Sequence, residues 1–232
     1  MLERSIRSLA LTAAEPSRLR FHVYAENASA LPAALARLRA EAPEAMRGLR
    51  AHTTDSFAPV TTTDATPSHR HLLLLPKLRV PAEYMRFYLP AALRALARKI
   101  LYLDVRTVAL HDVGALYDAA LSQSSWSVAA GVQRADVCRL GKLLNVSDAR
   151  AQQVRPSGWS QKQWAAAPCL ASVMLVIDVQ RWLARNTTAA VESWLAQNAQ
   201  RRMWKLGSLP PLMLALGQHW ERLPPAALPV SY

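Results

Sequence analysis

Cysteine is scarce in this chain, which has only Cys138 and Cys169 among its 232 residues. Two cysteines are too few for a disulfide framework or for a cysteine-rich zinc site, so both classes of small stapled domain are excluded. The sequence alone leaves open whether these two residues pair with each other.

Long hydrophobic runs are also missing. The uncharged stretch 164–177 is shorter than the roughly 20 residues that span a bilayer, and Pro168 interrupts it. The first residues, MLERSIRSLALTAAEP, carry charges throughout, and their apolar part is too short for a signal peptide. We therefore expect no transmembrane segment and no targeting signal within this sequence.

Acidic residues are few relative to basic ones. The chain has 28 Lys+Arg against 16 Asp+Glu, a formal charge of +12, which favours an anionic partner. Nucleotide-sugar phosphates, uronic-acid polymers, membrane surfaces and nucleic acid all fit this charge. The basic residues are scattered and form no patch with interleaved aromatic residues, so nucleic acid is not the expected partner.

The patterns that are present predict alternating helices and strands. Apolar residues recur at helical spacing in 3–12 and again after a capping Ser29, while 19–25 alternates like a strand. The remaining predictions are a loop over 51–70, a helix around 84–97, strands at 100–103 and 170–179, a loop-like stretch over 122–162, and helices after Thr187 or Thr188 and over 212–216. This alternation predicts one α/β domain over 1–232 with a mainly parallel sheet.

One strand delivers a carboxylate to the edge of that sheet. The apolar run Ile100–Leu103 is followed by Asp104, and the carboxyl ends of strands are where ligands bind in open α/β sheets. Asp104-Val105-Arg106 stands where a metal-dependent nucleotide-sugar enzyme would have Asp-x-Asp, two carboxylates that share a divalent cation. In this chain the second carboxylate is replaced by Arg106.

Four segments in a fixed order resemble one family. They are MRFYLPAAL (85–93), KILYLDVRTVALHDVGALYD (99–118), VMLVIDVQRW (173–182) and RRMWKLGSLPPLMLALG (201–217). The series resembles glycosyltransferase family 8, especially the galacturonosyltransferase-like branch and the glycosyltransferase 8 domain proteins. The resemblance covers nearly the whole chain, although no single segment is decisive.

The resemblance implies a GT-A-like fold, a UDP-sugar donor, a glycan acceptor, retention of anomeric configuration and a manganese ion that neutralises the departing diphosphate. By match to the family pattern, Arg86 helps to hold the donor, and Asp104 serves the ribose and the metal. A Golgi-lumen location is implied in the same way.

This sequence departs from the family pattern at several places. The family's first strand would precede Met1, and the segment 170–173 replaces a Phe-Asn-x-Gly whose asparagine faces the donor sugar. Gln133 and Arg134 stand near the place of acidic residues. The sequence ends before the family's late histidine motif is reached, and His219 lies too early to belong to that motif. We therefore expect an incomplete domain, truncated at both ends, with a degenerate metal site.

Each candidate residue also has a structural interpretation. Asp104 could cap its strand, Arg86 could form a structural ion pair, and Asp178 could cap a helix. Arg106 could replace the cation by pairing directly with phosphate, or it could be an ion-paired residue of a decayed site.

Two functions from different classes follow. The first is transfer of galacturonate, galactose or glucose from UDP to a glycan, for example in the synthesis of a cell-wall polysaccharide such as pectin. The alternative is an inactive family member that binds a partner glycosyltransferase or a glycan. The sequence does not decide whether the protein is an enzyme, and it identifies no catalytic residue.

Overall fold

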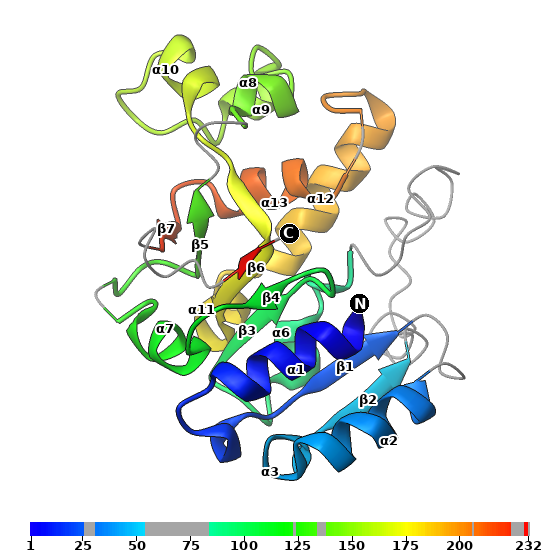
Figure 1. Ribbon diagram of the computed structural model, residues 1–232. Helices are drawn as coiled ribbons and strands as arrows, with labels where there is room; N and C mark the ends of the chain where they lie inside the picture. Colours follow the sequence, from blue (N-terminus) through cyan, green and yellow to red (C-terminus); the bar gives the residue numbers. More distant parts are fainter. Residues whose placement is uncertain are drawn as a thin grey trace.

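The computed structural model describes residues 1–25, 31–53, 84–122, 124–133, 138–205, 207–223 and 230–231 (Figure 1). Within these ranges, helices flank three small sheets, which confirms the predicted α/β class. In chain order the elements are α1 (Leu2–Thr12), η1 (Pro16–Arg18), β1 (His22–Ala25), α2 (Leu31–Glu41), α3 (Pro43–Met46), β2 (Arg50–Thr53), α6 (Leu89–Leu93), β3 (Lys99–Leu103), β4 (Val108–Ala109), α7 (Val113–Ala119), β5 (Ala129–Gln133), α8 (Leu140–Leu143), α9 (Ala149–Gln152), α10 (Gln161–Ala166), β6 (Leu170–Asp178), α11 (Val179–Ala184), α12 (Thr187–Gln200), α13 (Leu209–Leu216), β7 (Trp220–Arg222) and β8 (Val230–Ser231).

The amino-terminal part is built on the parallel pair β1–β2. Ile6 of α1 and Leu35 and Leu38 of α2 pack with Val23 of β1 in one buried cluster. The predicted first helix, strand and second helix are thus confirmed, although Ser29 lies outside the described residues. The predicted loop over 51–70 is wrong at its start, because the polar segment Arg50–Thr53 is ordered as a strand by its pairing with β1.

The largest sheet has the strand order β3-β6-β5-β7. Strand β6 runs antiparallel to both β3 and β5, whereas β5 and β7 are parallel. Residues 174–177 of β6 are completely buried, which is why this predicted strand reads as a continuous apolar run. Among the described strands the pairing is therefore mixed, not mainly parallel as the helix–strand alternation suggested.

Two stretches differ from the sequence-based prediction. The helix predicted around 84–97 is interrupted: residues 84–85 are helical, residues 86–88 form a turn, and α6 covers only Leu89–Leu93, with Pro90 in its first turn, a position that suits a helix start. The loop-like stretch 122–162 contains β5 and the two short helices α8 and α9, and a third short helix, α10, begins at its end. Helices of four to six residues are too short to show a periodicity in the sequence.

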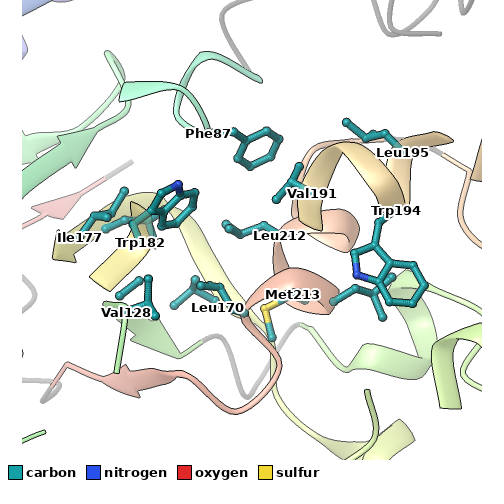
Figure 2. Packing of buried hydrophobic residues seen from close by; sticks show 14 of the residues in the cluster. Phe87, Val128, Leu170, Ile177, Trp182, Val191, Trp194, Leu195, Leu212 and Met213 are labelled. Carbon is teal, nitrogen blue, oxygen red and sulfur yellow. The ribbon is translucent and has the colours of Figure 1, made fainter. Parts of the chain in front are cut away.

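The main core lies between β6 and the helices α11, α12 and α13 (Figure 2). Trp182 is completely buried there, near Phe87 and Leu212. Its indole N–H donates to the Thr188 hydroxyl at 2.9 Å, and that hydroxyl donates to the Phe87 carbonyl at 2.7 Å. The predicted helix after Thr187 and the apolar helix over 212–216 are both confirmed, as α12 and α13.

Cys138 and Cys169 form a disulfide, with their Cα atoms 5.4 Å apart. The bond joins the chain just before α8 to the residue that precedes β6, and Arg139 and Pro168 form a β-bridge beside it. The segment that carries α8, α9 and α10 is thus closed at its base.

The pair β1–β2 carries two histidines in contact. Nδ1 of His22 and Nε2 of His52 are 3.1 Å apart, and the ring of Tyr24 stacks on His52 with centroids 4.5 Å apart. Burial lowers the pKa of both histidines below its ordinary value, and the positive charge of Arg50 lowers it further.

None of the helices in the described ranges combines the length and the apolar character needed to cross a membrane.

Replacing Trp182 by alanine should lower the free energy of unfolding by about 3–5 kcal/mol, because it empties a large buried volume. Trp159 is 42% exposed, and Trp159→Ala should change the stability by about 0.5 kcal/mol or less. Urea titrations followed by circular dichroism measure both values. Equal losses in the two variants would contradict the assigned core.

Reducing the Cys138–Cys169 bond should lower the free energy of unfolding by about 2–4 kcal/mol, because the bond closes a loop with a sequence separation of 31. Urea midpoints with and without dithiothreitol measure the change. The double variant Cys138→Ser/Cys169→Ser should not respond to the reductant. An unchanged wild-type midpoint would show that the bond is not formed.

Stability should fall as the pH falls through the ordinary histidine pKa of 6.5. The unfolded chain binds protons at His22 and His52 more readily than the folded chain, so acid favours unfolding. The double variant His22→Gln/His52→Gln should show a shallower decline of the melting temperature between about pH 7 and pH 5.

Candidate functional site

Asp104 lies at the carboxyl end of β3, where β6 begins. Its backbone N–H donates to the Val173 carbonyl at 2.8 Å and thereby extends the β3–β6 ladder by one residue. Its carbonyl accepts from the Thr107 N–H at 2.9 Å, which closes a turn over residues 104–107. The predicted position of this carboxylate at the edge of the sheet is confirmed.

Within this turn, the guanidinium of Arg106 forms a bidentate ion pair with the Asp104 carboxylate. Nε donates to Oδ1 at 2.9 Å and Nη2 donates to Oδ2 at 3.0 Å. The backbone N–H of Arg106 also donates to Oδ1, at 2.9 Å. The Asp104 side chain is 20% exposed and that of Arg106 is 64% exposed, so the pair opens toward solvent on its cationic side.

Arg86 is close enough to this carboxylate to act on it through its charge, and it lies in the turn that precedes α6. It is 5% exposed, and its guanidinium carbon lies 5.0 Å from the centroid of the Tyr102 ring. Tyr102 and Asp104 share one face of β3, since side chains alternate along a strand. The three residues singled out by sequence are therefore brought together.

The electrostatics of the site follow from these contacts. The hydrogen-bonded guanidinium of Arg106 holds the pKa of the Asp104 carboxyl below its ordinary value, against the opposing effect of burial. The positive charge of Arg86 lowers this pKa further. Asp104 is thus an ionised carboxylate that Arg106 binds directly and that the charge of Arg86 also stabilises.

The start of β6 lies beside Asp104. Leu103 pairs with Met174, and Gln133 pairs with Leu170 at the same edge of the sheet. Ala171, near the place of the family's donor-facing asparagine, is buried at 1% exposure and has no polar side chain. Arg134 lies outside the described residues.

Asp178, and His219, which the sequence already excluded as the metal histidine, lie at the opposite end of these strands. Asp178 pairs with Lys99 at the far end of β3, and its Oδ1 accepts from the Arg181 N–H at 2.8 Å. This confirms that Asp178 caps a helix, α11. The carbonyl of His219 accepts from the N–H of Val128, just before β5 begins, so this histidine is also remote from Asp104.

Tyr102 is the member of the site that sequence reasoning missed. The signal was present, because a residue two positions before Asp104 in a strand must face the same way. What could not be read from the sequence is that Arg86 folds over its ring.

Residues 4–226 match the sequence profile described as Glycosyl transferase family 8. The chain belongs to glycosyltransferase family 8. It is similar to "Probable galacturonosyltransferase-like 10" of Arabidopsis thaliana, with 29% identity over 150 residues that cover 62% of this chain and 38% of the relative. It is also similar to "Probable galacturonosyltransferase 10" of the same plant, with 30% identity over 60% of this chain and 24% of the relative. The matched part thus spans well under half of these relatives.

Solved structures of family 8 type share the fold. The galactosyltransferase LgtC, in complex with donor and acceptor sugar analogues, superposes with a TM-score of 0.63 at 16% identity over 95% of this chain and 68% of that one. Mouse xyloside xylosyltransferase 1, in its apo form, gives 0.61 at 12% identity over 96% and 78%. These neighbours confirm the GT-A-like fold.

Glycosyltransferases of this family and fold generally use a divalent metal, so the residues around Asp104 can be tested against one. A divalent cation requires several oxygen or nitrogen ligands on one centre. Both oxygens of Asp104 are held by Arg106, and the described ranges contain no group of three or more His, Cys, Asp or Glu side chains that could hold a metal. The described residues of this site do not fit a divalent cation.

Proposed function

We propose that this protein transfers a sugar from a nucleotide-diphospho-sugar, of the UDP type, to a glycan acceptor with retention of anomeric configuration. The match of residues 4–226 to the family profile carries this proposal. The names of the galacturonosyltransferase relatives support galacturonate as the transferred sugar. The formal charge of +12 suits an acidic donor and a pectin-like acceptor.

The donor is proposed to bind at Asp104, with its diphosphate toward the arginines. When the bond between sugar and diphosphate breaks, negative charge builds up on the leaving diphosphate, and fixed cations placed there lower the barrier. Arg106 is exposed enough to contact such a group, whereas the nearly buried Arg86 acts through its charge. Asp104 orients Arg106 by accepting two hydrogen bonds from its guanidinium.

A Golgi-lumen location is proposed for the protein. The disulfide between Cys138 and Cys169 supports it, since such bonds persist in oxidising compartments. The similarity to plant galacturonosyltransferases supports it as well.

The activity can be tested by supplying UDP-galacturonate, UDP-galactose and UDP-glucose with oligogalacturonide acceptors, and measuring both UDP release and acceptor elongation. We expect turnover with at least one donor. Asp104→Asn should lower kcat/KM about tenfold or more, because it removes a charge-assisted anchor of Arg106. Asp118→Asn, at an exposed carboxylate on α7, is the matched control and should leave kcat/KM unchanged.

Absence of transfer and of UDP-sugar hydrolysis with every donor would contradict the proposal. It would favour a family member that binds a partner glycosyltransferase or a glycan without catalysis. Co-purification with a second glycosyltransferase would then be the measurement to make.

A further inference from the structure

The chain contains the same Asp-x-Arg arrangement twice, at Asp104–Arg106 and at Asp148–Arg150. In the second copy Nε of Arg150 donates to Oδ1 of Asp148 at 2.9 Å and Nη2 donates to Oδ2 at 2.8 Å. The backbone N–H of Arg150 donates to the same Oδ1 at 3.0 Å. The local geometry of the two pairs is thus the same, which allows one to serve as the reference for the other.

The second pair is used for structure. The side chains of Asp148 and Arg150 are 5% and 22% exposed. Arg150 also donates to the carbonyls of Gln197 at 2.8 Å and Arg201 at 2.9 Å, so it ties α9 to the end of α12. Its guanidinium is directed into the protein.

The first pair differs in where its cation points. Arg106 is 64% exposed, although its carboxylate partner is only 20% exposed. The turn over 104–107 therefore anchors a guanidinium at the edge of the sheet and presents it to solvent. A guanidinium with a fixed orientation is suited to bind the oxygens of a diphosphate, because its planar N–H groups match phosphate geometry.

The formal charge of the Asp104–Arg106 pair can be compared with that of a metal-bound pair of carboxylates. Two carboxylates with one divalent cation sum to zero formal charge, and so does one carboxylate with one arginine. Exchanging the second carboxylate for Arg106 thus removes one metal ligand and leaves the formal charge of the site unchanged. Arg86 adds a further positive charge close to Asp104.

We propose that this protein binds the diphosphate of a nucleoside diphosphate without a divalent metal, and that Arg106, held in place by Asp104, occupies the position of the cation. The proposal rests on the proposed function, since it concerns the same donor site. It assigns to Arg106 a direct contact with phosphate oxygens and to Asp104 the positioning of that contact.

Titration calorimetry with UDP tests this, once in EDTA and once in Mn²⁺, with uridine and inorganic pyrophosphate as separate probes. We expect the wild-type chain to bind UDP with the same dissociation constant in both buffers. Pyrophosphate should compete with UDP and uridine should not, because the contact is to the phosphates.

Arg106→Gln should weaken UDP binding about tenfold to hundredfold in both buffers. Arg150→Gln is the matched control and should lower the melting temperature while leaving UDP affinity unchanged.

Arg106→Asp gives a second, independent readout. Two carboxylates would then lie one residue apart, so UDP binding by this variant should require Mn²⁺ and should be lost in EDTA. Equal UDP binding by this variant and the wild type in EDTA would overturn the proposal, because the charge of Arg106 would be dispensable.

The outcomes separate this inference from the proposed function. Wild-type UDP binding that disappears in EDTA overturns the metal-free site and leaves sugar transfer standing. Metal-free UDP binding that depends on Arg106, without sugar transfer from any donor, supports the site and overturns the proposed function. No UDP binding in either buffer overturns both.

Discussion

The antiparallel ladder between β3 and β6 holds the candidate site in place. Five residue pairs join the two strands, from Lys99–Asp178 to Leu103–Met174, and Asp104 adds one more hydrogen bond to Val173. Because residues 174–177 are buried on both faces, β6 cannot shift without exposing apolar surface to water. The end of β3 that carries Asp104 is therefore held in position by the core. Tyr102 lies on the same strand, and its ring fixes the position of the Arg86 guanidinium through a cation–π contact.

The site differs from a metal centre in how its charge is held. A metal site collects anionic groups from separate parts of a chain and depends on an ion from solution. Here the charge is held in a four-residue turn, in which the Thr107 N–H donates to the Asp104 carbonyl and Arg106 donates to the Asp104 carboxylate. Its function is decided by what surrounds it, as the contrast between the exposed Arg106 and the enclosed Arg150 shows.

The parts of the fold that were predictable from sequence are those with long or strong patterns. The helix near the amino terminus and the helix after Thr187 carry enough periodic residues to be recognised, and the buried strand β6 is recognised by its continuous apolar run. Strand β5 was hidden because its residues are small and buried, so no polar positions alternate with the apolar ones. The pairing directions depend on contacts between segments far apart in the sequence, which local patterns do not contain.

Within the site, the order of residues along the chain located Asp104 and Arg106, because a strand end and a residue two positions later are local features. The family pattern located Arg86. The mutual arrangement was beyond the sequence, since the grip of Arg106 on Asp104 and the position of Arg86 over Tyr102 are choices among side-chain conformers. The disulfide was likewise undecided until the fold brought Cys138 and Cys169 together.

The alternation of side chains along β3 makes this strand intolerant of changes in length. Inserting or deleting one residue between Lys99 and Leu103, with the ladder to β6 kept, would turn Tyr102 and its neighbours to the opposite face of the sheet. Leu101 and Leu103, which now pack beneath the sheet against a separate cluster, would then be directed toward Arg86. Point substitutions change one side chain of this site at a time, whereas a single-residue insertion or deletion in β3 would move several of its side chains to the opposite face of the sheet.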